Sequence, residues 1–94
     1  MKNINKAFDH RIRLGIMSAL VVNEFIDFNT LKEILGVTDG NLASHIKALE
    51  KMNYVTIHKQ FIGRKPNTKY SASSTGTLAF KKHIEALEKL IKNT

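Results

Sequence analysis

Between residues 29 and 52, hydrophobic and polar positions repeat twice in succession with the period of an α-helix. In the first repeat, apolar residues recur from Leu31 to Leu35, and either Asn29 or Thr30 could cap the start of the helix through its side-chain oxygen. The second repeat fills the rest of the stretch. The pattern therefore predicts two short consecutive helices.

The two predicted helices are separated by residues that favour a tight turn. Gly36 tolerates the positive φ that often ends a helix, because it has no Cβ to clash. The hydroxyl of Thr38 can accept from the backbone N–H near Asn41 and so cap the second helix. A helix, a glycine turn and a second helix form the helix-turn-helix pattern.

The second helix has an apolar face and an opposite face of distinctive composition. Leu42, Ile46 and Leu49 cluster within a narrow arc. The opposite arc carries short or basic side chains: Gly40, Asn41, Ser44, Lys47 and Lys51. Small polar groups would let this helix approach a DNA major groove closely, with amide and hydroxyl groups within reach of base edges. A solvated face beside a capped helix is the alternative explanation.

After residue 52 the sequence changes to the period of a β-strand. Alternation from Tyr54 to Phe61 and a short stretch from Thr68 to Ala72 predict two strands. The residues between them, IGRKPN, include Gly63, Pro66 and Asn67, which favour turns. A β-hairpin is therefore expected here.

The predicted hairpin is strongly basic. Between residues 55 and 72 it holds no acid and has four basic residues: Lys59, Arg64, Lys65 and Lys69. A cationic hairpin beside a helix that could enter a groove fits contact with DNA phosphates or with the minor groove. The alternative is that lysine and arginine protect an exposed strand edge from aggregation.

Two further helices are predicted near the ends of the chain. The first spans Asn5 to Asn23, where Gly15 indicates close backbone packing. Residues 25–28 then fit a short edge strand. The last helix covers about residues 74–92 behind a serine cap.

The apolar stripe of the last helix is broader than so small a domain should bury alone. Pairing with the same helix of a second copy, together with N-terminal residues, would cover the stripe in a twofold interface. The residues expected in this dimer interface are Ile4, Phe8, Phe80, Ile84, Leu87 and Ile91. The alternative is one face on the domain's own core and an uncovered remainder.

Composition and charge narrow the class of protein. Ninety-four residues with 43% hydrophobic content predict one globular domain with a core of limited size. A formal net charge of +7 attracts polyanions at long range. No apolar run is long enough to span a bilayer, and the N-terminal stretch lacks the hydrophobic segment of a signal peptide. We therefore expect a cytoplasmic protein with no membrane partner.

Enzyme and metal chemistry have little support in the sequence. Four histidines lie on four different predicted elements, and no two have the i, i+4 spacing that helps histidines chelate a metal: His10, His45, His58 and His83. Because the chain has no cysteine, disulfides and thiolate ligands are excluded. A Gly-rich phosphate loop, a nucleophile elbow and clustered acids are also missing. We expect no catalysis, no metal and no cofactor.

The order of these elements resembles that of winged-helix regulators of the MarR and ArsR type, and more closely that of small stand-alone prokaryotic winged-helix proteins related to them. The resemblance is carried by HRIRLGIMSAL, FNTLKEILGVTDGNLASHIKALEKMNYV and FIGRKPNTKYSAS. It implies an α+β, mainly α, fold with a single winged helix-turn-helix domain over residues 1–94. The helix-turn-helix would lie at about 29–52, the β-hairpin wing at about 54–72 and a C-terminal dimerisation helix at about 74–92.

The resemblance also implies a homodimeric transcriptional regulator that binds specific sequences of double-stranded DNA. By position, its recognition helix in the major groove would offer Thr38, Asp39, Gly40, Asn41, Ser44, His45 and Lys47, and its wing Lys59, Arg64, Lys65 and Lys69. Metal-sensing relatives use cysteine thiolates, and ligand-binding relatives tend to be longer, so effector sensing is not expected. A winged helix used as a protein-interaction or RNA-binding module is the main alternative.

Overall fold

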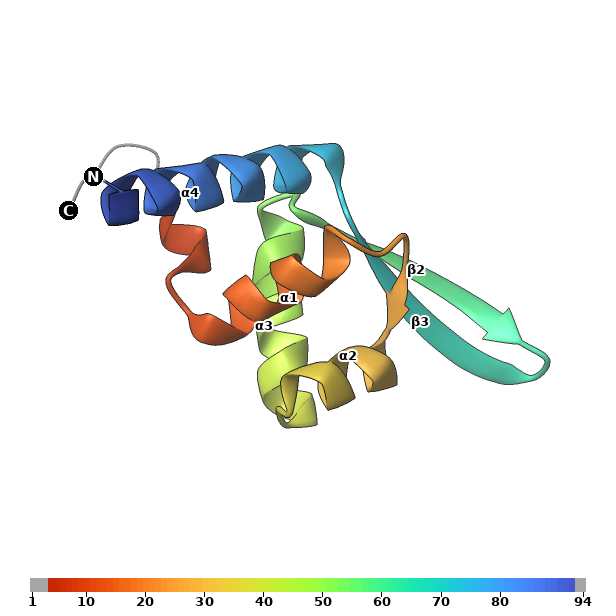
Figure 1. Ribbon diagram of the computed structural model, residues 1–94. Coiled ribbons are helices and arrows are strands. Elements are labelled where there is room, and N and C mark those ends of the chain that lie inside the picture. Colours follow the sequence, from red (N-terminus) through yellow and green to blue (C-terminus); the bar gives the residue numbers. More distant parts are fainter. Residues whose placement is uncertain (1–3, 93–94) are drawn as a thin grey trace.

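The computed structural model describes residues 4–92 and shows an α+β fold that is mainly helical (Figure 1). Over these residues, four α-helices accompany a three-stranded antiparallel sheet with strand order β1-β3-β2. In chain order, the elements are the 3-10 turn η1 (Lys6–Phe8), α1 (Arg11–Leu20), β1 (Ile26–Asp27), α2 (Phe28–Leu35), α3 (Asp39–Lys51), β2 (Val55–Ile62), β3 (Lys65–Ala72) and α4 (Ser74–Lys92). This is the winged helix-turn-helix architecture expected from the sequence, with β2 and β3 as the wing.

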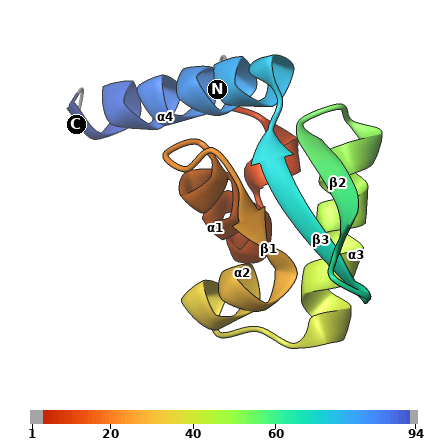
Figure 2. The same cartoon turned by 90° about the vertical axis from the view of Figure 1, so that its right-hand side faces the viewer.

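Helices α1, α2 and α3 share one apolar core. The largest fully buried side chains all come from these three helices: Ile16, Met17, Leu20, Leu31, Leu42 and Leu49. Burial of one such side chain contributes about 1.5–3 kcal/mol, so the apolar face of α3 is held inward and its polar face outward. Helix α4 lies across the end of the domain opposite α2 (Figure 2).

In the helix-turn-helix, the turn between α2 and α3 is as predicted, but the residue that caps the start of α2 is not. Gly36 ends α2 with a φ of 62°, and the side chain of Thr38 accepts a backbone N–H in the first turn of α3 at 3.2 Å. At the start of α2, however, the prediction of Asn29 or Thr30 as the cap is wrong. The cap is Asp27, whose carboxylate accepts from the N–H of Thr30 at 2.8 Å. Asp27 ends β1 with an extended backbone, which is the conformation a cap requires.

The predicted helix over residues 5–23 is divided into η1 and α1. Each piece has its own cap: the side chain of Asn5 accepts from the N–H of Ala7 at 2.9 Å, and Nδ1 of His10 accepts from the N–H of Ile12 at 3.1 Å. Both capping residues have an extended backbone. The prediction of one continuous helix is therefore wrong, because each extended cap starts a separate helical piece.

The wing is a regular hairpin with a shorter turn than the sequence predicted. β2 and β3 pair along their whole length, so the turn consists of Gly63 and Arg64 alone. The predicted six-residue turn is wrong, because Pro66 pairs with Phe61 within the strands. β1 pairs only with residues 69–70 at the base of β3. Near the tip β3 is thus an edge strand, where a proline without an N–H is tolerated.

A three-residue connection joins α3 to β2 and sets the direction of the hairpin. Asn53 has a φ of 62°, a left-handed conformation that asparagine tolerates better than most residues. Its N–H donates to the carbonyl of Glu50 at 2.9 Å, and the N–H of Tyr54 donates to the carbonyl of Leu49 at 3.0 Å. These bonds satisfy carbonyls at the end of α3 and fix the angle at which β2 leaves it.

Two aromatic residues that we expected at a dimer interface belong to the core. Phe8 and Phe80 are 2% and 7% exposed, and their rings meet edge to face with centroids 5.5 Å apart. Phe8 also stacks on Tyr54, with centroids 5.6 Å apart. The N–H of Asn5 donates to Nδ1 of His83 at 3.1 Å and holds the N-terminal segment against α4. The structure therefore assigns both rings to the core of one chain rather than to a surface for a second copy.

Two glycines allow close packing, and they should respond differently to alanine. A Cβ at Gly76 would overlap the backbone of Tyr54, so Gly76→Ala should lower the free energy of unfolding by about 2–3 kcal/mol. A Cβ at Gly15 would lie 2.7 Å from a terminal methyl of Leu35, which can rotate away, so Gly15→Ala should cost less than about 1 kcal/mol. Urea denaturation measures both changes. Equal losses would contradict this packing.

Candidate nucleic-acid interface

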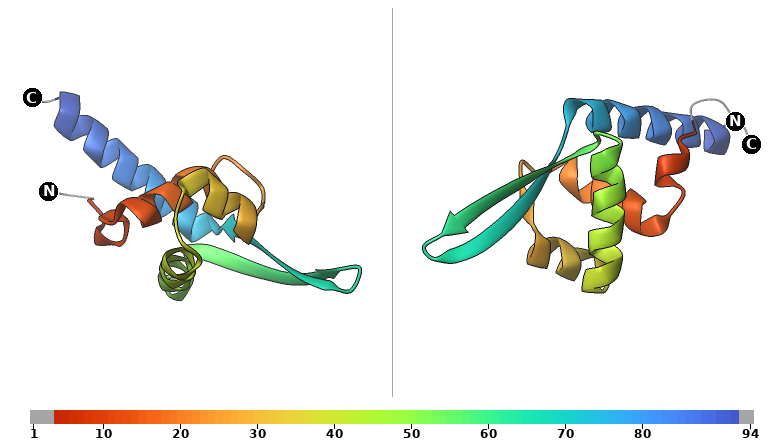
Figure 3. Two further views of the ribbon diagram at one scale, coloured as in Figure 1. Left: turned by 90° about the horizontal axis from the view of Figure 1, so that it is seen from below. Right: turned by 180° about the vertical axis from the view of Figure 1, so that it is seen from behind.

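Helix α3 and the hairpin project from the same side of the domain. Seen from below, α3 stands end-on beside the base of the hairpin, and α1, α2 and α4 lie on the other side of both (Figure 3, left). Seen from behind, α3 and the hairpin are in front (Figure 3, right). A long polymer lying across this side could therefore contact the helix and the hairpin together.

The outward face of α3 carries the short polar residues that the sequence placed there. Gly40, Asn41, Ser44 and Lys47 are all exposed, whereas the apolar residues of the other face are buried. Amide, hydroxyl and ammonium groups thus stand on a helix whose backbone can come close to its target. This composition suits hydrogen bonding to base edges in a major groove.

Two predicted site residues at the start of α3 have structural roles. Thr38 caps the helix, as described above. The carboxylate of Asp39 forms an ion pair of 2.6 Å with the ammonium of Lys32 on α2. Both side chains are solvent-exposed, so such a pair contributes at most about 1 kcal/mol. These contacts hold the first turn of α3.

His45 contacts α1 instead of sharing the outward polar face. Its Nδ1 accepts from Nε–H of Arg13 at 3.0 Å, and its ring lies 4.2 Å from the ring of His10. Burial lowers the pKa of His45, and the charges of His10 and Arg13 lower it further. A neutral His45 therefore bridges α3 to α1. Arg13, which the sequence did not single out, is held beside α3 by this bond.

A groove of about 510 Å³ separates α3 from the hairpin. It is lined by Ala43, Ile46, Lys47, Glu50, Ile57, Lys59 and Tyr70. Lys47 comes from α3 and Lys59 from β2, so each wall of the groove supplies one cation. Burial raises the pKa of the Tyr70 hydroxyl, and the nearby carboxylate of Glu50 raises it further. The groove combines two cations, the carboxylate of Glu50 and apolar side chains.

The four basic residues predicted in the wing do not all lie at its tip. Arg64 is in the turn and Lys65 is the first residue of β3, and both are exposed. Lys59 lines the groove beside α3. Lys69 lies near the base of the hairpin, where its ammonium is 4.0 Å from the centre of the Phe25 ring in a cation–π contact. Of these four residues, the tip holds two.

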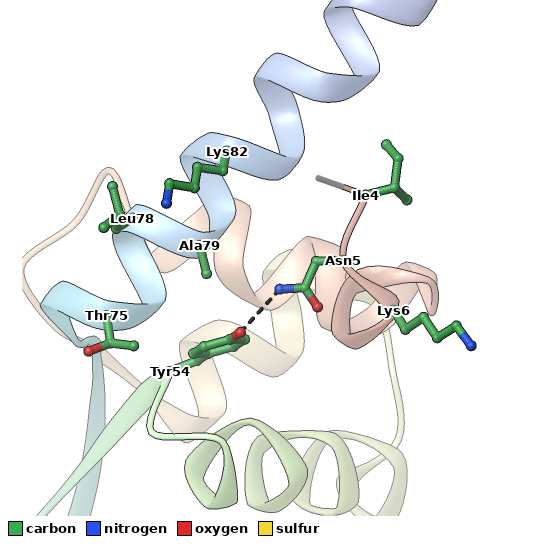
Figure 4. A pocket seen from close by; sticks show the side chains of 8 residues that line it. All are labelled: Ile4, Asn5, Lys6, Tyr54, Thr75, Leu78, Ala79 and Lys82. Atoms are coloured by element: carbon green, nitrogen blue, oxygen red, sulfur yellow. Dashed lines mark hydrogen bonds between the residues drawn. The ribbon is translucent and has the colours of Figure 1, made fainter. Parts of the chain in front are cut away.

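A second cavity, of about 470 Å³, lies between the N-terminal segment, the start of β2 and the first half of α4 (Figure 4). Its lining residues are Ile4, Asn5, Lys6, Tyr54, Thr75, Leu78, Ala79 and Lys82. The amide of Asn5 donates to the hydroxyl of Tyr54 at 3.1 Å. Sequence periodicity did not predict this cavity, because three separate segments form it.

The family comparison agrees with this geometry. The winged helix DNA-binding domain family matches residues 12–91 of the chain. The chain belongs to this family. An uncharacterized protein from Methanocaldococcus jannaschii is 38% identical over 88 residues, which cover 94% of this chain and 96% of that protein.

Solved structures show the same winged-helix fold. A transcriptional regulator homologue from Pyrococcus horikoshii has a TM-score of 0.82 at 28% identity, covering 99% of this chain and 97% of that one. The YusO protein from Bacillus subtilis has a TM-score of 0.83 at 14% identity, covering 94% of this chain and 62% of that one, and it shows the fold alone. The family and the Pyrococcus structure identify a DNA-binding regulator and point away from an enzyme.

The described part of the winged-helix chain offers neither a membrane span nor a clustered metal site. None of its helices is both long and apolar enough to cross a bilayer. Within residues 4–92, no three acidic or histidine side chains gather closely enough to hold a metal ion. His10 and His45 lie side by side, but Nδ1 of each accepts a hydrogen bond, from Ile12 and Arg13 respectively.

The neutral state of His45 should make stability depend on pH. Because its pKa is lowered on folding, the unfolded chain binds this proton more readily. The stabilisation is complete above the ordinary pKa of 6.5 and is lost as the pH falls from there toward the lowered value. Urea denaturation between about pH 7.5 and pH 5 should show a smaller acid loss of stability in His45→Gln than in the wild type. If the stability of both proteins depended on pH identically, His45 would not be held neutral by folding.

Proposed function

We propose that this winged-helix domain regulates transcription as a homodimer that binds specific sequences of double-stranded DNA. Helix α3 enters the major groove of each half-site, and the hairpin contacts the adjacent backbone or minor groove. One observation carries the proposal: the short polar face of α3 and the acid-free hairpin project from one side of the domain (Figure 3).

Sequence recognition is assigned to the outward face of α3. The amide of Asn41 and the hydroxyl of Ser44 are exposed and can hydrogen-bond to base edges. Gly40 adds no side chain that would hold the helix away from the groove floor. The major groove is about 12 Å wide, which accommodates one α-helix.

The groove between α3 and the hairpin supports the same docking. A helix in a major groove and a hairpin at the neighbouring minor groove have one sugar–phosphate strand between them. Lys47 and Lys59, on opposite walls, would bind phosphates of that strand. Arg64 and Lys65 would bind phosphates at the tip, on or beyond the minor groove.

Helix α4 supports pairing with a second copy. One stripe of α4 is buried in its own chain: Gly76, Phe80, His83 and Ala86. Elsewhere on α4, Ile84, Leu90 and Ile91 are 40%, 44% and 74% exposed, while Leu87 and the nearby N-terminal Ile4 are half-buried. A twofold pair would cover these side chains. Its symmetry would match a palindromic site with half-sites roughly 34–36 Å apart.

The hairpin tip and α3 should make separable contributions to binding. Arg64→Ala and Lys65→Ala should each weaken binding to all duplex sequences and reduce the salt slope by about one, because each removes a phosphate contact. Asn41→Ala should instead change the preference at one base pair by about 1–3 kcal/mol. Fluorescence titrations at several salt concentrations measure both, with a competing RNA to test the alternative target.

A charge-matched control keeps this test specific. Lys81→Ala removes an exposed cation from α4, on the other side of the domain, and should leave the salt slope nearly unchanged. If Arg64→Ala and Lys81→Ala reduced the slope equally, the hairpin would have no special contact with DNA. Equal affinity for palindromic and random duplexes would contradict sequence-specific binding.

The dimer should depend on the exposed side of α4. Ile84→Glu places a charge on this side and should convert the dimer to monomers, because an unpaired carboxylate would be desolvated at the interface. Sedimentation velocity measures the mass. The matched control is Ile34→Glu, because Ile34 on α2 is 57% exposed and lies outside the proposed interface. This variant should stay dimeric. A wild-type protein that sediments as a monomer at working concentrations would rule out the proposed assembly.

A further inference from the structure

The tip of the hairpin carries a phenylalanine that the core does not use. Phe61 is 75% exposed, the most of the five phenylalanines in the chain. It is the last residue but one of β2, where the hairpin extends well beyond the helices (Figure 1). An aromatic ring left in water does not stabilise this fold, so it is available for contact with a partner.

Phe61 lies on the face of the hairpin that looks toward α3. Side chains alternate along a strand, and Ile57 and Lys59, four and two residues before Phe61 on the same face, line the groove beside α3. The cross-strand neighbour of Phe61 is Pro66. The tip thus presents an aromatic ring and a proline on the face of the hairpin that borders α3 and the start of α2. Ile62, also exposed, points to the opposite face and pairs with Lys65.

Cations lie on both faces of the hairpin near this apolar pair, with Lys59 on the same face and Lys65 on the other. Arg64 and Lys65 are the two residues that follow the end of β2 and the turn glycine, and no Asp or Glu occurs between residues 51 and 84. An apolar group among cations complements a polyanion with an apolar interior. Duplex DNA has this character, with stacked bases inside a phosphate backbone. The short polar face of α3 on the same side favours a duplex over an anionic membrane.

A single side chain from the tip suits the minor groove. The turn has only two residues, so few side chains stand at the tip, and one of them can enter a minor groove about 6 Å wide. Pro66 has a fixed φ and gives the ring a rigid neighbour. Proteins that bend DNA from the minor groove insert Phe, Leu, Ile, Met or Pro between base steps.

We infer that Phe61, supported by Pro66, inserts between two base pairs from the minor groove and kinks the duplex. Arg64 and Lys65 bind the phosphates that flank the opened step. This inference rests on the proposed DNA-binding function and adds a specific contact to it. The affinity of the hairpin for a site would depend on how easily the base step under the tip unstacks. Flexible pyrimidine–purine steps should therefore be preferred under the tip.

The test uses the full-length protein and duplexes of a selected site that carry 2-aminopurine at successive positions. The fluorescence of this base rises when it unstacks. The wild-type protein should raise it at one step in each half-site. Phe61→Ala should abolish the rise and weaken binding about tenfold, with an unchanged salt slope because no phosphate contact is lost. Phe61→Leu, which keeps an apolar wedge, should retain part of the rise.

Ile62→Ala is the matched control, since it removes an exposed apolar side chain from the other face of the same tip. It should keep the fluorescence rise and bind within about threefold of the wild type. A wild-type complex with no unstacked step, or a Phe61→Ala complex that keeps the rise, would overturn the wedge and leave sequence-specific binding intact. Failure of the wild type to bind any duplex would overturn both proposals. Phe61-dependent binding to phosphatidylserine-containing vesicles, without unstacking of DNA, would assign the tip to a membrane surface.

Discussion

The short junction at the end of α3 fixes how the hairpin and α4 are placed relative to that helix. Residues 52–54 alone connect α3 to the hairpin, and the left-handed conformation of Asn53 fixes the angle between them. The carbonyl of Tyr54 then accepts from the N–H of Ser73, which ends the hairpin, at 3.0 Å. Gly76 lets α4 pack against the same backbone. One small region therefore positions α3, the hairpin and α4 relative to one another.

The sequence predicted those parts of the fold that depend on local patterns. The buried face of α3, the glycine turn at Gly36 and the cap at Thr38 all follow from residues within one turn of each other. The break before α1 was missed because a regular apolar stripe runs through it, and only the extended backbone of His10 divides the helix. Pro66 was predicted in a turn, but it lies in β3. A proline is tolerated there because β1 pairs only with the base of β3 and leaves that edge open near the tip, and no local sequence pattern shows where β1 ends.

In the candidate site, as in the fold, the features that depend on local sequence patterns were predictable. Side chains that point outward from a single helix, such as Asn41 and Ser44, were identified from the helical wheel alone. Contacts between elements have no period in the sequence, so the bond from Arg13 to His45 and the burial of Phe8 became visible only in three dimensions. The two cavities are of the same kind, since each is lined by distant segments of the chain.

The central claim is that α3 and the hairpin bind one duplex through neighbouring grooves, and affinity cleavage tests it most directly. The chain has no cysteine, so Ser44→Cys and Arg64→Cys can each carry a single iron chelate that cuts nearby DNA. We expect cuts from position 64 in the minor groove about half a helical turn, roughly five base pairs, from the major-groove cuts of position 44, and the same pattern in both half-sites. Localised cuts from position 44 with none from position 64 would contradict the shared binding surface.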